Sequence, residues 1–557
     1  MDVVDRCVGG SNGIDEAGEA SDDRGDGSDE CAELAAACRI AETGRSCLRM
    51  AALVISGRVA TMDDASAPFD GRVWVRDGRV VDVTKGAKGK VGFSDAVVVD
   101  VGGAFVLPGF IDMHNHLAYN LLPLWSEPGR TEPWLHNKHW TGAGTYTESI
   151  TEPAWVYAKA APEALLAYVQ VREMAGGATA AQGWPTANRG YGTIVRNIDS
   201  EAAGTGRDDL IFTSVVTKTG DALANRVRDM DAGAGFIYHC AEGQRGSRVL
   251  RDYTDLAADD GLLSTFIGIH CCAVDAANWQ RWGQNTAGGV VWSPTSNMLL
   301  YNQTTLIPDV RSRGVRVCLG SDWGPSGTKN VLGEMKVARI MSDAFTWGLS
   351  DRDIVEMVTV NPGILLERCW NVPIGRLVPG AFADITVLRG HGRGTPWTRI
   401  LAGTERDIAL VVIDGTARYG DATLMTAVAA PPSFTMTVGG RRRRVALPSA
   451  TDPANAWTWT DIMATLRKVQ RNPQAAMTKA SARASTGSRF GPTAELELFP
   501  DMPDSRLSGR AGPPKHPELV RIPTIPSIEH DAGYFRALAR APIHQGALNP
   551  LRGWFRS

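Results

Sequence analysis

The sequence predicts an α/β protein in which a (β/α)8 barrel occupies the middle of the chain. Residues 108–374 alternate short apolar runs with segments of helical periodicity, the pattern of a parallel sheet covered by helices. Strand-like runs also lie on both sides of this block, at residues 50–107 and 375–425. These two flanking groups predict one small β domain built from both ends of the barrel.

The first residues differ in composition from the rest of the 557-residue chain. Within residues 1–30, ten acidic side chains stand against two arginines and are interleaved with glycine and serine. Such a stretch cannot bury enough apolar surface to offset the entropy lost on ordering. We expect residues 1–48 to form a disordered acidic segment.

The strands of the β domain are expected in five runs, three before the barrel and two after it. In the second run, Asp77 and Gly78 separate two alternating stretches, which is a hairpin pattern. The five runs are Leu53–Gly57, Val73–Val83, Val97–Asp100, Ala383–Leu388 and Ile408–Gly415.

The barrel is expected to have eight strands. Seven are apolar runs, namely Phe110–Met113, Ala178–Gln182, Leu210–Thr217, Phe236–His239, Phe266–His270, Val290–Trp292 and Val315–Leu319. An eighth strand near Thr193–Ile198 would close the barrel. Helices are expected at Pro162–Met174, Ala222–Asp231 and Asn330–Ala344.

Residues 426–557 form a C-terminal extension whose role the sequence leaves open. Residues 456–471 could form an amphipathic helix, and the chain beyond 472 is rich in proline, serine and arginine. The run Arg441–Arg444 is expected to be a solvated strand end, because charge runs usually face water. The extension could wrap around the barrel or pack against a second subunit of a homo-oligomer.

The overall composition excludes several classes of protein. A content of 43% apolar and 21% charged residues indicates a folded chain, and a net charge of −3 gives no general attraction to nucleic acid or anionic membranes. No apolar run approaches the ~18 residues that cross a bilayer, and no basic and then apolar stretch marks a secretory signal. The nine cysteines form no CxxC pair, which argues against a disulfide framework. We therefore expect a cytoplasmic protein with no nucleic-acid or membrane partner.

Candidate metal ligands lie at the ends of the predicted barrel strands. His114 and His116 follow one strand and are two residues apart, so their side chains point the same way on an extended chain. His239 ends another strand, and Asp322 follows a third, where a buried carboxylate needs a partner or a metal. Three imidazoles and one carboxylate suit a zinc or iron ion with a coordinated water, whose pKa such an ion lowers toward ~7.

Two further residues could move protons at this site. Glu242 lies three residues after His239 and could pass a proton to a leaving group without binding the metal. His270 ends a fourth strand and could hydrogen-bond the attacking water or a developing oxyanion. A single strand-end histidine is usually structural, so the prediction depends on the joint pattern. His136 and His139 lie in a loop and are expected to be solvated or to contact substrate.

These segments together resemble the motifs of the amidohydrolase superfamily. Leu107–His116 resembles its opening motif, and His239–Glu242 resembles the His-x-x-Glu motif of its deaminase and chlorohydrolase branch. The remaining similar segments are Ser293–Asn297, Gly320–Asp322 with Leu332–Met335, Asn361–Pro362 and Ile374–Asp384. The resemblance covers residues 50–425.

The resemblance implies a TIM barrel inserted in a small β-sandwich, with hydrolysis at a metal-activated water. It implies one divalent metal ion per chain, with zinc favoured over iron, held by His114, His116, His239 and Asp322. Glu242 would shuttle protons, His270 would orient the reacting oxygen, and Asp322 would also act as a base. Binuclear members carry a carboxylated lysine near the position of Lys218, but the His-x-x-Glu motif favours a single metal.

The long loop after the first barrel strand, residues 117–160, is rich in tryptophan. Together with tryptophans near other strand ends it predicts a flat aromatic pocket, the alternative being that the indoles pack loops onto the barrel. The expected substrate-binding residues are Trp125, Trp184, Trp292, Asn297 and Trp323.

Three functions remain open at this point. The leading one is hydrolytic deamination of a ring amine on a purine-, pyrimidine- or triazine-like small molecule, the work of a hydrolase acting on carbon–nitrogen bonds other than peptide bonds. The second is hydrolysis of a linear or cyclic amide. The third is a catalytically silent scaffold of the same fold, which would be expected to lack a ligand or Glu242, whereas all are present.

Overall fold

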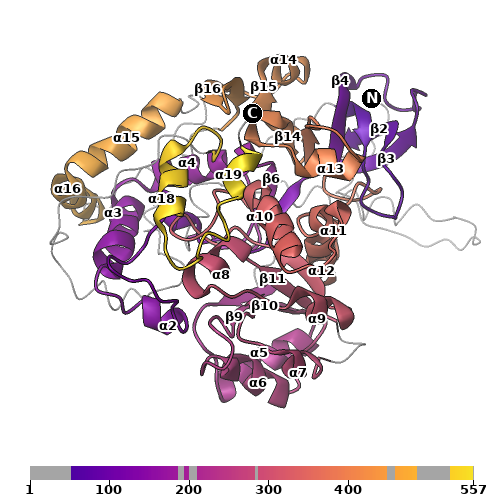
Figure 1. The fold of residues 1–557 in the computed structure, drawn as a ribbon. Helices are drawn as coiled ribbons and strands as arrows, with labels where there is room; N and C mark the ends of the chain where they lie inside the picture. Colours follow the sequence, from indigo (N-terminus) through magenta and orange to yellow (C-terminus); the bar gives the residue numbers. More distant parts are fainter. Residues whose placement is uncertain are drawn as a thin grey trace, which may run out of the picture. The chain divides into compact units, whose positions relative to one another are not determined.

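The computed structural model describes residues 52–185, 194–199, 210–282, 287–447, 458–485 and 527–555 (Figure 1). The chain divides into two units, Met1–Arg49 and Met50–Ser557. The expected disordered segment, residues 1–48, lies outside the described residues. No helix in the described ranges has the length and apolar character needed to cross a membrane.

The described residues include eight parallel barrel strands. They are β5 (Phe110–Asp112), β6 (Ala178–Ala181), β7 (Arg196–Asn197), β8 (Ile211–Ser214), β9 (Gly235–Cys240), β10 (Phe266–His270), β11 (Gly289–Trp292) and β12 (Arg316–Leu319). Strands β5 to β7 form one ladder and β8 to β12 another. The last strand meets the first, because Met113 N–H donates to Leu319 O at 3.2 Å and Asp322 N–H donates to His114 O at 2.9 Å. Each predicted barrel strand is therefore present.

Helices lie between the barrel strands and after the last of them. They are α2 (Asn137–Trp140), α3 (Glu152–Ala160), α4 (Pro162–Ala175), α5 (Asp221–Asp231), α6 (Leu250–Ala258), α7 (Ala276–Trp279), α8 (Pro294–Tyr301), α9 (Ile307–Ser312), α10 (Val331–Ala344), α11 (Asp351–Glu356) and α12 (Val360–Trp370). Proline opens α4 and α8, where its missing N–H costs no hydrogen bond. Asn330 caps α10 by accepting from Gly333 N–H. The three predicted helices correspond to α4, α5 and α10.

Strands from both sides of the barrel share one nine-stranded sheet in the described residues. The strands are β1 (Leu53–Val59), β2 (Phe69–Arg76), β3 (Arg79–Lys85), β4 (Val97–Pro108), β13 (Ile385–Leu388), β14 (Ile408–Ile413), β15 (Thr416–Asp421), β16 (Phe434–Val438) and β17 (Arg441–Val445). Strand β4 joins the two groups by pairing parallel to β1 and antiparallel to β13. The turn between β2 and β3 has positive φ at Asp77 and Gly78, as the hairpin pattern predicted.

The arginine run of β17 is only partly solvated, which corrects the expectation from sequence. Arg443 is buried, and its guanidinium contacts the Asp421 carboxylate and donates to the Arg406 carbonyl. The physical reason is strand alternation, which turns successive side chains to opposite faces. Burial of Arg443 is tolerated because a carboxylate pairs with it.

One buried ion pair joins the barrel to the sheet. Arg196 on β7 donates to both Asp384 carboxylate oxygens at 3.1 Å and to Asp414 at 2.8 Å. Its guanidinium also lies 3.8 Å from the centre of the Phe382 ring. The Arg196 and Asp384 side chains are buried, whereas Asp414 is exposed. The ion pair holds barrel strand β7 against the start of β13, the first sheet strand after the barrel.

Helix α14 (Ala422–Ala427) lies against β15, and the C-terminal extension then adds β16 and β17 to the sheet. After these strands, the described part of the extension packs on the barrel helices of the same chain. Its helices are α15 (Trp459–Arg471), α16 (Pro473–Ser485), α18 (Ala532–Arg540) and α19 (Leu551–Trp554). Helix α15, expected from its amphipathic pattern, lies beside α4, and α19 lies beside α10 (Figure 1). Asp531 pairs with Lys329 at 2.5 Å, and Tyr534 donates to Gly327 O at 3.3 Å. These contacts hold the segment that follows β12.

Candidate metal centre and active site

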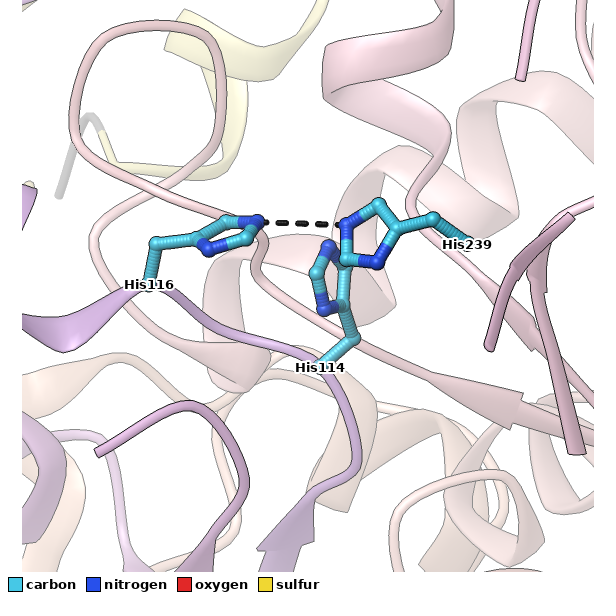
Figure 2. Close-up of side chains that lie close together, drawn as sticks. All are labelled: His114, His116 and His239. Atoms are coloured by element: carbon cyan, nitrogen blue, oxygen red, sulfur yellow. Dashed lines mark hydrogen bonds between the residues drawn. The ribbon is translucent and has the colours of Figure 1, made fainter. Parts of the chain in front are cut away.

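Three histidine rings from two barrel strands point toward one another. His114 and His116 follow β5, and His239 lies near the end of β9. Figure 2 shows the rings converging, with His116 Nε2 3.3 Å from His239 Nε2. All three are buried, and one nitrogen from each lies within 4.8 Å of the others. Burial and the neighbouring rings hold the pKa of His239 well below its ordinary value.

Asp322 joins this histidine cluster from the end of β12. Its Oδ1 lies 3.1 Å from His114 Nε2 and 3.6 Å from His116 Nε2. The backbone holds it there, because His116 N–H donates to Asp322 O at 2.7 Å. Although burial opposes ionisation, the surrounding histidines hold the pKa of Asp322 well below its usual range. The structure thus brings together all four side chains that were predicted as ligands.

The tautomer of His114 tests whether this donor set fits a metal ion. Gln182 donates through Nε2 to Asp199 at 3.0 Å, so its Oε1 faces His114 Nδ1 at 3.2 Å and accepts from it. A neutral His114 with its proton on Nδ1 turns the lone pair of Nε2 toward the Asp322 carboxylate. A carboxylate oxygen and an imidazole nitrogen 3.1 Å apart need a proton or a metal ion between them. The separations also fit tetrahedral zinc ligands, which lie about 3.4 Å from one another.

A buried polar network behind the ligands sets their spacing. Asn115 donates to Asp112 at 2.9 Å and to Glu173 at 3.2 Å, and Ser321 N–H donates to Asp112 at 3.0 Å. The network therefore ties the end of β5 to the end of β12. Burial, and then the neighbouring Asp112, raise the pKa of Glu173 well above its ordinary value. Sequence reasoning missed these residues, since a carboxylate inside helix α4 carries no local mark of a buried role.

Glu242 and His270 lie beside the ligands, as predicted. His270 Nε2 is 3.8 Å from Glu242 Oε1, and the two form a close group with His239. On its other side, His270 Nδ1 lies 3.1 Å from Asn297 Oδ1. Asn297, expected to bind substrate, is fully buried behind His270 and orients that ring. The described residues contain three groups of His, Cys, Asp or Glu side chains that are close enough to hold a metal ion. All three groups are drawn from the same six residues, namely His114, His116, His239, Glu242, His270 and Asp322.

Four tryptophans were expected at the substrate site. Within the described residues, only the Trp323 ring contacts one of the proposed ligand histidines. The Trp323 ring centre lies 6.0 Å from that of His116. The other three make contacts elsewhere: Trp125 stacks on Trp134, Trp184 donates to Ala181 O at 3.0 Å, and Trp292 donates to Thr304 at 2.6 Å. Trp184 and Trp292 are fully buried, which favours the packing alternative for those two indoles.

The long loop after β5 also contacts the segment after β9. His136 pairs with Gly243 through a backbone bridge, and Asn137 N–H donates to Glu242 O at 3.2 Å. His136 is buried at this contact. The loop thus reaches Glu242, the residue expected to shuttle protons.

Lys218 follows β8, and its backbone N–H donates to the Tyr238 hydroxyl at 3.0 Å.

Several known proteins are similar to this chain in sequence. The amidohydrolase family model matches residues 231–418. A 5-methylthioadenosine/S-adenosylhomocysteine deaminase of Desulfitobacterium hafniense is 24% identical over 403 residues, which cover 64% of this chain and 90% of that protein. One from Syntrophobacter fumaroxidans is 26% identical over 384 residues, covering 60% and 84%. The family match and these relatives support assignment of the chain to the amidohydrolase superfamily.

Solved structures with low sequence identity share the fold of this chain. An adenosine deaminase from Xanthomonas campestris with bound zinc has a TM-score of 0.51 at 16% identity and covers 68% of this chain and 97% of its own. An atrazine chlorohydrolase from Arthrobacter aurescens TC1, complexed with zinc, has a TM-score of 0.50 at 16% identity and covers 68% and 100%. The predicted fold class, a (β/α)8 barrel with an accompanying β domain, is confirmed.

Proposed function

We propose that this amidohydrolase is a metal-dependent hydrolase that removes a ring amine, as ammonia, from a small purine-like molecule. The observation that carries the proposal is the convergence of three buried imidazoles and the Asp322 carboxylate beside Glu242 and His270. The curated relatives, named as deaminases of adenosine derivatives, support the purine class. The imidazole-rich donor set favours zinc over iron.

Different residues of the site carry out the proton transfers of this reaction. A bound divalent ion supplies Lewis-acid activation of a water molecule. Asp322 accepts a proton from that water, and His270 hydrogen-bonds the oxygen as it attacks the ring carbon. Glu242 delivers one proton to the ring nitrogen, then takes up the remaining proton of the attacking water and passes it to the departing amine. The proton held by Asp322 returns to Glu242, which restores the starting state of both carboxyl groups. Water and the ring amine thereby give a ring carbonyl and ammonia.

We expect the purified, metal-loaded protein to release ammonia from 5′-methylthioadenosine or adenosine, with guanine and melamine as comparison substrates. Glu242→Gln is expected to lower kcat by about 10²- to 10⁴-fold, because it removes the proton carrier. The variant keeps the four proposed ligands, so its metal content is expected to match wild type. Ammonia release and metal content per chain are the two measurements.

Three results would count against this proposal. A Glu242→Gln enzyme that turns over like wild type would remove the proposed proton shuttle. A new carboxylate formed from an amide substrate, without ammonia from any ring amine, would indicate amide hydrolysis instead. A metal-loaded protein without turnover of either class would favour the silent scaffold.

A further inference from the structure

A tyrosine outside the predicted site bonds directly to Glu242. Tyr301, the last residue of α8, donates its hydroxyl proton to Glu242 Oε1 at 2.6 Å. Trp140, from the long loop after β5, donates its indole N–H to the same hydroxyl at 2.8 Å. All three side chains are buried. Tyr301 and Glu242 are 59 positions apart in the sequence, and Tyr301 and Trp140 are 161 positions apart.

The chemistry of the three groups determines which atom donates in each of the two hydrogen bonds. An indole N–H can only donate, so the Tyr301 oxygen accepts from Trp140 and turns its single proton toward Glu242. Burial, and then the carboxylate, raise the pKa of Tyr301 well above its ordinary value, which keeps that proton on the hydroxyl. A hydrogen bond to an ionised carboxylate is about twice as strong as a neutral one.

We propose that Tyr301 is a positioning residue that occupies Glu242 Oε1 and leaves Oε2 to carry the shuttled proton, with Trp140 orienting the Tyr301 hydroxyl. The inference rests on the proposed function, in which Glu242 moves protons. Among the described residues, His270 Nε2 also lies near Oε1, 3.8 Å away. Without the hydroxyl, the Glu242 side chain is free to rotate toward that ring. Catalytic groups must be held within about 0.5 Å of their working position.

Tyr301→Phe tests the proposal by removing one oxygen atom and keeping the ring. We expect kcat for ammonia release from 5′-methylthioadenosine to fall by about 10- to 100-fold, the loss typical of a misplaced catalytic group. KM is expected to stay within about threefold, because the hydroxyl is bonded to Glu242 rather than to substrate. Metal content is expected to be unchanged. Trp140→Phe is expected to lower kcat in the same way, by less.

A matched control is Tyr253→Phe. Tyr253 has an equally buried ring, and its hydroxyl donates to the Asn278 carbonyl at 3.2 Å. This variant loses a buried tyrosine hydrogen bond at a different place in the barrel, so kcat is expected to equal that of wild type. Unfolding midpoints of both variants separate a general loss of stability from a loss at Glu242.

The double variant with Glu242→Gln separates this inference from the proposed function. If Tyr301 acts through Glu242, Tyr301→Phe adds no further loss of kcat in the Glu242→Gln background. A wild-type kcat in Tyr301→Phe, or a rise in KM equal to the loss of kcat/KM, would overturn the role of Tyr301 while a slow Glu242→Gln enzyme leaves deamination intact. If Glu242→Gln alone is as fast as wild type, the proposed function itself fails.

Discussion

Replacing His239 with alanine is expected to strip the protein of its metal ion and of its activity. The side chain supplies one of four converging donors, and its Nε2 lies 3.3 Å from that of His116. Removing an outer partner of a metal ligand already weakens binding by about 10- to 100-fold, so loss of a ligand itself is expected to exceed that range. Metal content per chain, measured on unchelated protein after dialysis, and ammonia release are the readouts.

His391→Ala is the matched control, because the His391 side chain is half exposed, follows β13 and pairs with Asp407, 3.9 Å away. It is expected to keep one ion per chain and full activity. Adding zinc or iron back to chelated wild-type protein shows which ion restores the rate. One tightly held ion that persists in His239→Ala would contradict the proposed ligand set, and two ions in wild type would bring Lys218 back into consideration.

The metal ligands could be predicted because their positions follow from strand geometry. Side chains two apart on a strand point the same way, and the ends of parallel barrel strands meet at one mouth. The first rule pairs His114 with His116, the second brings His239 and Asp322 to them, and the structure shows the four side chains together. Glu242 follows for the same reason, since it comes directly after β9. Neither rule requires knowledge of a distant contact.

Tyr301, Gln182 and Glu173 could not be found in this way. Each lies on a helix or after a strand whose sequence has no local mark of function, and each acts through a partner far along the chain. The sequence also does not predict how an aromatic ring is oriented. The same tryptophan pattern is compatible with a substrate pocket and with packed loops, and Trp184 and Trp292 are buried in the packed manner.

The third barrel strand shows the same limit in the fold itself. β7 spans only Arg196–Asn197, and both side chains are polar and buried, so no apolar run marks the strand. A strand was expected near Thr193–Ile198 because a closed barrel needs an eighth one. Arg196 is compatible with burial because Asp384, 188 residues later, pairs with it. The strand is therefore stabilised by a partner that the local sequence does not contain.

Arg196→Met is accordingly expected to destabilise the folded protein strongly. Methionine keeps much of the volume but leaves the buried Asp384 carboxylate without its cation, and breaking one partner of a buried pair costs about 3–5 kcal/mol. Burial already raises the pKa of Asp384 above its ordinary value, so the unpaired carboxylate is expected to take up a proton and recover only part of this loss. The free energy of unfolding in urea, with metal present throughout, is the measurement.

Asp414→Asn separates the two carboxylates that Arg196 contacts. Asp414 bonds the same guanidinium at 2.8 Å, but its side chain is 57% exposed, and exposed pairs contribute about 0–1 kcal/mol. Asparagine also tolerates the positive φ of 50° at this position. The asparagine variant is thus expected to lose less than about 1 kcal/mol. Equal losses in the two variants would show that the exposed contact, rather than the buried pair with Asp384, joins the barrel to the sheet.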